Sequence, residues 1–379
     1  MNHTQALRLR KSFGSSRRWV VKIGSALATN DGLGLNDGAI DAWAEQIVAL
    51  GGNARDIVVV TSGSVADGAA RLGWRERPHA LNQLQAAAAL GQTGLARAWD
   101  RAFEKRGKRA AQVLLTHEDL SDRTRYLNAR STLWTLLELG AVPVVNENDT
   151  VATAEISLGD NDTLAGLVSN LIDADLLVIL TDQEGLMSAD PRKDTNALRI
   201  AHAHVDDHQL SAIAGEGGAW GRGGMLTKLS AAKLASRSAT ATIIASGKDA
   251  NVLGALAAGE DVGTLLYSDE EKLASRKQWL AGTIRVCGAI EVDAGARRAL
   301  TERGTSLLPV GVTNVEGQFA RGELVSLIGA EGQEFARGLA SYSSEECAKI
   351  AGATSSEIES ILGYEQEPEV IHRDNLVLL

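Results

Sequence analysis

Two lysines stand where they could neutralise negative charge on a ligand. Lys22 lies inside the short apolar segment Trp19–Ile23, and Lys228 follows the Gly-rich segment Gly221–Gly224. Burying an unpaired ammonium group is costly, so a lysine in an apolar strand calls for a partner or a function. An edge strand with Lys22 in water is the alternative. A Gly-rich loop that leads into a helix, with a lysine in its first turn, predicts a phosphate-binding loop.

Two bursts of short polar residues follow the apolar segment Val142–Val145. The first is Asn146–Asp149 and the second is Gly159–Asp162. Carboxamides donate hydrogen bonds to carboxylates, and carboxylates accept them from ammonium groups. The two bursts therefore predict a site for a small zwitterion. The alternative for the second burst is that Asp160 or Asn161 is a plain helix N-cap.

Small residues also follow the segment Asp56–Thr61. The stretch Ser62–Gly68 runs into an expected helix, where backbone N–H groups can approach an anion. An ordinary turn with a serine N-cap is the alternative. No G-x-x-x-x-G-K-[ST] pattern occurs, which excludes a P-loop nucleotide site. His202, His204 and His208 match no metal-binding pattern and predict the start of a surface helix.

Short apolar segments alternate with long Ala- and Leu-rich segments over most of the chain. The apolar segments are Trp19–Ile23, Asp56–Thr61, Ala111–Leu115, Val142–Val145, Leu176–Thr181 and Ala241–Ala245. The segments with helical spacing include Ala80–Arg106, Tyr126–Leu139, Asp162–Ala174 and Met225–Ala239. This alternation predicts an α/β fold, a three-layer α/β/α sandwich with a mainly parallel sheet. Ligands of such sheets bind at the carboxyl ends of the strands, where the polar residues above lie.

The pattern changes after about residue 283, where helices become scarce and Gly-punctuated strand signals take over. The expected strands are Ala289–Val292, Ser306–Leu308, Gly311–Val315, Leu324–Ile328 and Glu334–Tyr342, with one short helix at Ala294–Arg303. These signals predict a separate small β-rich domain. Residues 287–379 hold 7 Lys+Arg and 15 Asp+Glu, so they carry −8 of the total net charge of −10. Nucleic-acid binding normally needs a basic surface, which this domain lacks.

The composition favours a two-domain protein of the cytoplasm. A chain of 379 residues exceeds the size at which single cores stop growing. Its two cysteines, Cys287 and Cys347, form neither a disulfide framework nor a zinc site, and they are expected to be packing residues. No apolar stretch reaches the roughly 18 residues of a membrane helix. Residues 1–17 are basic, lack the apolar run of a secretory signal and are expected to form a flexible tail, and His372–Asp374 is expected to be a solvated tail or a domain contact.

From Trp19 onward the chain resembles the amino-acid kinase family. The resemblance rests on VVKIGS (20–25), VTSGSVADG (60–68), RYLNAR (125–130), VPVVNENDTVATAEISLGDND (142–162), LTDQEGL (180–186), ADPR (189–192), GGMLTK (223–228) and SLLPVGV (306–312). The long string at 142–162 is the most specific, and it resembles members that phosphorylate the side-chain carboxylate of L-glutamate, the first step of proline biosynthesis. Arg222 stands where the family often has a smaller threonine, and SVADG stands where SGAVAAG-like sequences are commoner.

The resemblance implies roles for single residues. Lys22 and Lys228 would contact the transferred phosphoryl group, and Asp162 would lie between the two lysines and hold them in place. The implied glutamate-binding residues are Ser62, Asp149 and Asn161. The implied nucleotide-binding residues are Lys22, Gly24, Thr181, Asp182, Arg222, Gly223, Gly224, Met225, Leu226, Thr227 and Lys228. Gly24, Gly63 and Gly224 would let backbone amides approach phosphate oxygens.

The resemblance also implies ATP as phosphate donor, with Mg²⁺ held by phosphates and water and by no protein ligand. It implies a homo-oligomer, dimer or tetramer, and feedback inhibition by proline. The C-terminal part resembles a PUA domain over about residues 286–364. We expect that domain to have a structural or regulatory role, and RNA binding is the alternative.

The expected division of the chain has five parts: a tail at 1–17, a kinase domain at 18–275, a linker at 276–285, a PUA domain at 286–364 and a tail at 365–379. Two alternatives stay open. The chain could act on acetylglutamate or aspartate instead, or it could be an RNA-binding protein without kinase activity. The complete set Lys22, Asp149, Asp162 and Lys228 speaks against a loss of activity.

Overall fold

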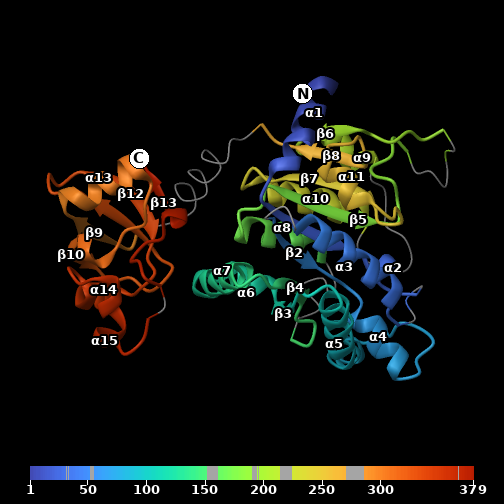
Figure 1. Cartoon of the computed structure of the whole chain (residues 1–379), viewed down its shortest axis with the longest axis horizontal. Helices are drawn as coiled ribbons and strands as arrows, with labels where there is room; N and C mark the ends of the chain where they lie inside the picture. The colour runs from blue at the N-terminus through green and yellow to red at the C-terminus, as the bar shows by residue number, and fades with distance from the viewer. Residues whose placement is uncertain are drawn as a thin grey trace. The chain divides into compact units, whose positions relative to one another are not determined.

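The computed structural model describes the chain apart from residues 31, 33, 52–54, 152–160, 190–193, 195, 214–223, 270–285 and 366. The chain forms two compact units, drawn in Figure 1. The first takes Met1–Ser121 and Asn128–Lys272, and the second takes Asp122–Leu127 and Leu273–Leu379. Each unit has a hydrophobic core of its own. The expected linker at 276–285 lies outside the described residues.

The first unit is built on a sheet in which eight strands follow the order β3-β4-β2-β1-β5-β7-β8-β6. The strands are β1 (Arg18–Ile23), β2 (Asp56–Val60), β3 (Ala110–Leu115), β4 (Val142–Glu147), β5 (Leu176–Thr181), β6 (His202–His204), β7 (Ala241–Ser246) and β8 (Thr264–Tyr267). All neighbouring pairs are parallel except β7 with β8. The mainly parallel sheet is confirmed, and each of the six predicted apolar segments forms a strand.

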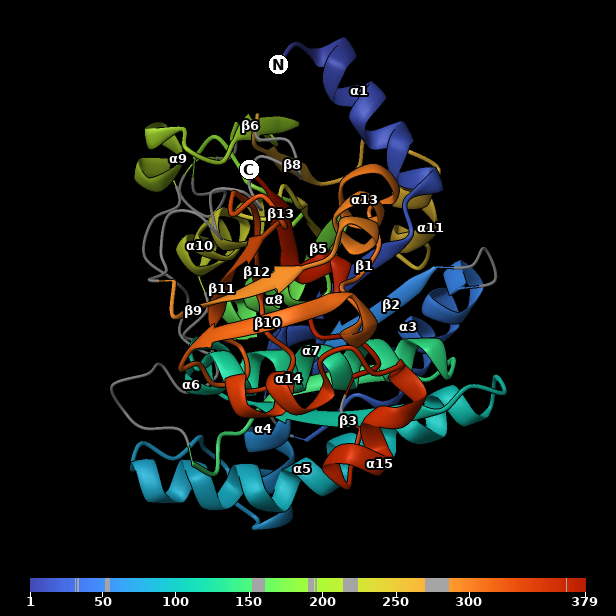
Figure 2. The ribbon, with the colours of Figure 1, turned by 90° about the vertical axis from the view of Figure 1, so that its left-hand side faces the viewer.

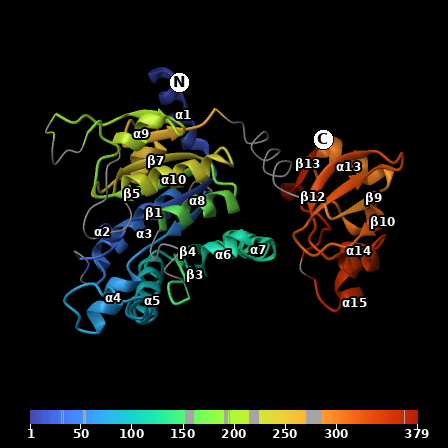
Figure 3. The ribbon, with the colours of Figure 1, turned by 180° about the vertical axis from the view of Figure 1, so that it is seen from behind.

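Helices cover both faces of this sheet. The helices along this part of the chain are α1 (His3–Ser12), α2 (Ser25–Ala28), α3 (Asp37–Gly51), α4 (Ser64–Arg71), α5 (Leu81–Glu104), α6 (His117–Ser121), α7 (Arg123–Glu138), α8 (Asn161–Leu171), α9 (His208–Ile213), α10 (Met225–Ser236) and α11 (Val252–Ala257), and the first residues of α7 belong to the second unit. Apolar side chains of α3, α5 and α11 pack with Val21, Val59 and Val178 into one cluster. On the other face α8 packs along β1 and β5 and α10 along β5 and β7 (Figure 3). Strands buried on both faces explain the continuous apolar runs in the sequence.

The N-terminal residues form an ordered helix, so the prediction of a flexible tail over residues 1–17 was wrong. Helix α1 begins with a capping box between Asn2 and Gln5. The side chain of Arg10 is buried, pairs with Asp261 at 3.2 Å and donates hydrogen bonds to four backbone carbonyls. A basic segment suggests a solvated tail, but these acceptors come from residues about 190–250 positions away, which sequence pattern does not reveal.

The histidine-containing segment also differs from its prediction. His202 and His204 lie in β6, an edge strand that pairs with β8, and only His208 starts a helix, α9. A strand of three residues shows no periodicity of its own. Its pairing with β8 decides its conformation.

The second unit contains a five-stranded sheet in the order β10-β9-β11-β12-β13, and Figure 2 shows β10, β9, β11 and β12 side by side. The strands are β9 (Gly288–Val292), β10 (Val312–Gly317), β11 (Leu324–Ile328), β12 (Glu334–Leu339) and β13 (Leu376–Leu378). Its helices are α13 (Ala294–Arg303), α14 (Ser344–Ile350) and α15 (Ile358–Leu362). The predicted β-rich domain is therefore confirmed, and helix α13 has the predicted bounds.

Two predictions for this unit were wrong. The expected tail at 365–379 contributes the buried Val370 and Ile371 and the strand β13, which pairs with β12. Segment Ser306–Leu308 is not a strand, because only Leu307 forms an isolated bridge, with Ile371, before the short 3₁₀ turn Pro309–Gly311. Both errors come from pairing between segments that are distant in the sequence.

Candidate active site

Three charged side chains meet in the buried centre of the first unit. The two carboxylate oxygens of Asp162 each face a lysine: Oδ1 lies 2.6 Å from Nζ of Lys22, and Oδ2 lies 3.0 Å from Nζ of Lys228. All three residues are at most 7% exposed. The alternative of an edge strand with Lys22 in water is wrong, because β1 lies between β2 and β5. The structure thus brings together the three residues that were expected to be catalytic.

Close packing of two helices brings Asp162 and Lys228 into contact. Asp162 is in the first turn of α8, and Lys228 is in the first turn of α10. Gly166, one turn further along α8, lies so close to α10 that a Cβ atom there would be 2.7 Å from the carbonyl oxygen of Ala231. A larger residue would force the helices apart and separate the carboxylate from the ammonium group.

The electrostatics of the group favour an ionised carboxylate. Burial alone would raise the pKa of Asp162, but the positive charges of Lys22 and Lys228, together with hydrogen bonds from Lys22 and Thr227, hold this pKa well below its usual range. The hydroxyl of Thr227 donates to Oδ2 of Asp162 at 2.7 Å. The cluster therefore holds two lysine side chains against one carboxylate.

A network of amides and hydroxyls lies beside this group, at the ends of β2 and β4. Nδ2 of Asn161 donates to Oγ of Ser62 at 2.9 Å and to Oδ1 of Asn146 at 3.2 Å. Nδ2 of Asn146 donates to Oε1 of Gln92 at 2.7 Å and to Oγ of Ser64 at 3.4 Å. Two of the three residues expected to bind glutamate, Ser62 and Asn161, are thus in direct contact.

The third expected residue, Asp149, joins the same network through Ser64. Oγ of Ser64 donates to Oδ2 of Asp149 at 3.1 Å. Burial raises the pKa of Asp149 to about 6, against the opposing effects of the Ser64 hydrogen bond and the positive charge of Arg77. A buried carboxylate that is costly to keep ionised is suited to receive a cationic group.

Two buried oxygens of this network have no hydrogen-bond partner among the described residues. They are Oδ1 of Asp149 and Oδ1 of Asn161. Buried polar atoms are nearly always satisfied, so two unsatisfied acceptors in one network indicate where a ligand donates. An ammonium group has three donors and no acceptor, and it fits such a pair.

The residues expected to bind the nucleotide lie on the other side of β1. Thr181 ends β5, Asp182 follows it, and the hydroxyl of Thr181 donates to Oδ1 of Asp182 at 3.1 Å. Gly24 directly follows β1, and a Cβ atom there would be 3.3 Å from the carbonyl oxygen of Leu180. Strands β1 and β5 are neighbours, but the chain continues from β1 to β2 on one side of this pair and from β5 toward β7 on the other. Ligands of open α/β sheets bind at such a point, outside the carboxyl ends of the two strands.

The N-terminus of α10 completes this side. Gly224 is its N-cap and makes no side-chain capping bond, so the amides of Met225, Leu226 and Thr227 are left without a side-chain cap. Arg222 and Gly223 were also expected to bind the nucleotide, and both lie outside the described residues. So do residues 152–160 of the polar string.

Three residues of the network were not singled out from the sequence. Ser64 and Asn146 lie inside the polar segments that the sequence did mark, so their composition was a signal, but their partners were not visible. Gln92 gave no signal, because it lies in the middle of the long helix α5. Its role depends on where α5 packs.

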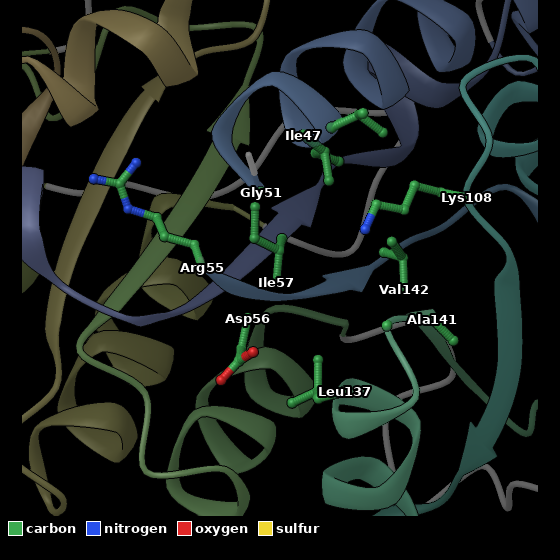
Figure 4. Close-up of a pocket in the computed structure, with 11 residues that line it drawn as sticks. Ile47, Gly51, Arg55, Asp56, Ile57, Lys108, Leu137, Ala141 and Val142 are labelled. Atoms are coloured by element: carbon green, nitrogen blue, oxygen red, sulfur yellow. The ribbon is translucent and has the colours of Figure 1, made fainter. Parts of the chain in front are cut away.

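A pocket at the opposite edge of the sheet is not part of this site. It is lined by Ile47, Val48, Gly51, Arg55, Asp56, Ile57, Lys108, Leu137, Gly140, Ala141 and Val142, near the starts of β2 and β4 (Figure 4). The guanidinium group of Arg55 points away from it and donates to the carbonyl oxygens of Phe13, Gly14 and Ser16. Asp56 pairs with Arg17 at 3.0 Å. None of the residues expected to be functional lines this pocket.

The remaining predictions concern cysteines, metals and membranes. Cys347 is fully buried in the core of the second unit, and the partly buried Cys287 packs against that core. Both are packing residues, as predicted. In the part of the chain that the structure describes, no cluster of three or more His, Cys, Asp or Glu residues could hold a metal ion. No described helix is both long and apolar enough to cross a membrane.

Two family models and several known proteins match this chain. The model of the amino acid kinase family matches residues 17–246, and the model of the PUA domain matches residues 288–362. A glutamate 5-kinase of Pseudomonas putida is 58% identical over 372 residues, which is 98% of this chain and 100% of the relative. A glutamate 5-kinase of Hahella chejuensis is 55% identical over 380 residues, which is 100% of this chain and 98% of the relative.

A solved structure, that of a UMP kinase from Bacillus anthracis, is 16% identical, covers 67% of this chain and 97% of its own, and has a TM-score of 0.46. The family models match most of the sequence, and the relatives match it nearly end to end. The chain belongs to the amino acid kinase family and, within it, to the glutamate 5-kinases that carry a C-terminal PUA domain.

Proposed function

We propose that this chain transfers the γ-phosphoryl group of ATP to the side-chain carboxylate of L-glutamate, giving ADP and L-glutamyl 5-phosphate, the first step of proline biosynthesis. The observation that carries the proposal is the buried carboxylate of Asp162 between the ammonium groups of Lys22 and Lys228. Family membership supports the choice of glutamate, since the relatives named above are glutamate 5-kinases.

The chemistry requires positioning and charge rather than a base. A carboxylate oxygen of glutamate attacks the γ-phosphorus, a new P–O bond forms, and the bond from the γ-phosphorus to the β–γ bridging oxygen breaks as ADP leaves. The attacking oxygen is already ionised, so no proton has to be removed. Negative charge spreads over the equatorial oxygens of the phosphoryl group in the transition state, and Lys22 and Lys228 stabilise that charge.

Asp162 acts by holding the lysines. It pairs with both ammonium groups and fixes their separation before substrates bind. Preorganised charges need no rearrangement when the reaction occurs, which is the source of their effect in a buried site. Asp162 itself touches neither substrate in this scheme, so it is a positioning residue.

Ser62, Asp149 and Asn161 bind glutamate in the proposal. The unsatisfied oxygens Oδ1 of Asp149 and Oδ1 of Asn161 accept hydrogen bonds from the α-ammonium group. The nucleotide lies on the β5 side, near Thr181 and Asp182, with its phosphates at Gly24 and at the segment 224–228. Arg222 and Gly223 are assigned to the nucleotide by the resemblance alone.

The donor set of the site fits Mg²⁺ that is held by phosphates and water. The carboxylate nearest the proposed phosphoryl position, Asp162, has both oxygens paired with lysines. When bound to ATP, Mg²⁺ would add positive charge on the phosphate oxygens.

Four further properties belong to the proposal because of family membership. They are inhibition by proline at or beside the glutamate site, a homo-oligomer of two or four subunits, a cytoplasmic location, and a structural or regulatory rather than RNA-binding role of the PUA domain. The inhibition is tested by initial rates at subsaturating glutamate. Initial rates that stay unchanged at millimolar proline would refute the proposed inhibition.

The experiment that tests the reaction traps the product. Purified protein is incubated with ATP, Mg²⁺ and L-glutamate, and hydroxylamine converts the acyl phosphate to a hydroxamate. Parallel reactions contain N-acetylglutamate or aspartate. Hydroxamate from glutamate alone is expected. Product from another acid would assign a different substrate within the family, and no product from any acid would refute the kinase assignment.

A further inference from the structure

The side-chain amide of Asn146 stands at the centre of the hydrogen bonds that hold the glutamate-binding residues. It is 1% exposed. Its Nδ2 donates to Oε1 of Gln92 at 2.7 Å and to Oγ of Ser64 at 3.4 Å, while its Oδ1 accepts from Nδ2 of Asn161 at 3.2 Å. Each neighbour turns a donor or an acceptor toward this amide. The orientation of the amide therefore decides whether the neighbour presents a donor or an acceptor to a ligand.

One arm of the network runs from Asn146 to Asn161. Nδ2 of Asn161 is engaged by Oδ1 of Asn146 and by Oγ of Ser62. Its oxygen, Oδ1, must then point the other way, and it is buried without a hydrogen-bond partner among the described residues. This arm ends on an acceptor.

The other arm runs from Asn146 to Asp149. Oγ of Ser64 accepts from Asn146 and so directs its own hydrogen toward Oδ2 of Asp149, at 3.1 Å. The second oxygen, Oδ1 of Asp149, is buried and has no hydrogen-bond partner within the described ranges. Both arms thus end on acceptors, which suit the three donors of an ammonium group.

Gln92 and Ser64 together set the polarity of both arms, because each accepts a hydrogen bond from Nδ2 of Asn146. A carboxamide can turn over by 180° with little change of shape, so only its partners decide where its oxygen lies. The shortest bond of Asn146 is the one to Oε1 of Gln92. Without that acceptor only the long bond to Ser64, at 3.4 Å, opposes a turn of the Asn146 amide. A turned amide would reverse Asn161 and place an N–H donor against the ammonium group.

Helix α5 holds Gln92 in position. Gly91 lies so close to α4 that a Cβ atom there would be 1.8 Å from the carbonyl oxygen of Ser64. Further along α5, Nε1 of Trp99 donates to Oγ1 of Thr61 at 3.1 Å, and both side chains are buried. The helix is thus anchored to the loop after β2 on both sides of Gln92.

We infer that Gln92 is a positioning residue that makes the site selective for an α-ammonium group, acting through Asn146 on Asn161 and on the Ser64–Asp149 pair. This inference rests on the proposed function and extends it to the recognition of one group of the substrate. Gln92 stands outside the phosphoryl-transfer residues, so its effect should appear on amino-acid binding and be absent from ATP binding.

The test compares two variants and two ligands. Gln92→Leu removes the acceptor at similar size, and Gln92→Glu keeps an acceptor oxygen. The ligands are L-glutamate and glutarate, the same five-carbon diacid without the amino group. Binding is measured as KM in the hydroxamate assay, or for glutarate as Ki against glutamate if it is not phosphorylated. Thr93→Ala, at an exposed position one residue further on α5, is the matched control.

For Gln92→Leu, the KM for glutamate is expected to rise by about 10- to 100-fold, as for a lost hydrogen bond to a charged group, while the KM for ATP and the constant for glutarate change by less than about threefold. Gln92→Glu is expected to restore most of the preference for glutamate. Equal losses for both diacids, or no rescue by Gln92→Glu, would show that Gln92 only supports the fold. A failure of the proposed function would appear separately, as absence of product from the unmodified protein.

Discussion

At the scale of single residues, the site is organised around a carboxylate shared by two lysines. Two ammonium groups and one carboxylate leave the cluster with a net charge of +1, in surroundings where each member is almost fully buried. Such a buried charge is costly, because it has little solvent to stabilise it. Phosphate oxygens bound as proposed would remove this cost, so the nucleotide would stabilise the cluster.

Removal of one lysine is predicted to abolish most of the activity. In Lys228→Ala the transferred phosphoryl group loses one of its two cations, and kcat is expected to fall by about 10²- to 10³-fold, as for a lost transition-state donor. The matched control is Lys233→Ala on the same helix, where the side chain is exposed and pairs with Asp206 at 2.8 Å. A kcat within tenfold of the unmodified protein, with the helical circular dichroism preserved, would contradict the role of Lys228.

The raised pKa of Asp149 predicts a pH dependence. Burial raises this pKa to about 6, so the carboxylate that would bind the ammonium group becomes protonated as the pH falls below that value. We expect kcat/KM for glutamate to drop by about tenfold for each pH unit below 6, since kcat/KM reports groups of the free enzyme. The side-chain carboxylate of the substrate has a lower pKa, about 4.3, and does not account for this change.

The measurement is the pH profile of kcat/KM for glutamate between pH 5 and pH 8. Asp149→Asn is expected to lower kcat/KM throughout and to abolish the limb near pH 6. A limb that persists in this variant would assign the titration to another group.

At the scale of elements, glycines set the distances that the site requires. Gly166 brings α8 close to α10, and Gly91 brings α5 close to α4. In each case a Cβ atom would collide with a backbone carbonyl oxygen, which cannot move as a flexible side chain can. Helix packing in this unit thus fixes both the Asp162–Lys228 contact and the position of Ser64.

Gly91→Ala tests this dependence. The added methyl group would lie 1.8 Å from the carbonyl oxygen of Ser64, so α4 and α5 must separate and the bond from Ser64 to Asp149 must lengthen. We expect a loss of about 1–3 kcal/mol in the free energy of unfolding, as for overpacking elsewhere, and a higher KM for glutamate with little change in the KM for ATP. Thr93→Ala again serves as the control. Unchanged stability and KM would show that the helices adjust without cost.

At the scale of the whole molecule, most of the net charge lies in the C-terminal residues 287–379, which contain the segment that matches the PUA domain. Residues 287–379 carry −8, whereas the first 286 residues carry only −2. The second unit also has a hydrophobic core of its own. A folded domain with an acidic composition is poorly suited to bind a polyanion.

The charge of residues 287–379 predicts no general RNA binding. In a filter assay with total tRNA, we expect no retention at physiological salt and none at about 50 mM salt, where phosphate contacts would be strongest. Saturable binding that weakens steeply with salt would contradict this prediction and would give the PUA domain a function in RNA recognition.

The sequence by itself determined the α/β fold class and the presence of a second, β-rich domain. Short apolar segments that alternate with long helical segments predict a parallel sheet covered on both faces, and all six predicted strands occur. Lys22 and Lys228 stood out in the sequence because a lysine is unusual in an apolar strand and marked after a Gly-rich loop. Asp162 lies in a polar segment, and its place between the lysines was implied by the resemblance to the family. Hydrophobic pattern and residue type are local properties, which a single sequence shows directly.

The tertiary structure decided everything that depends on which distant segments meet. Arg10 is buried because acceptors near residues 201 and 260–263 surround it, and the C-terminal residues form a strand because β12 offers an edge. Gln92 shows the same limit within the site: a glutamine in a helix has no distinctive pattern. Its hydrogen bond to Asn146 exists only because α5 packs against α4, and close packing is a property of backbones in three dimensions.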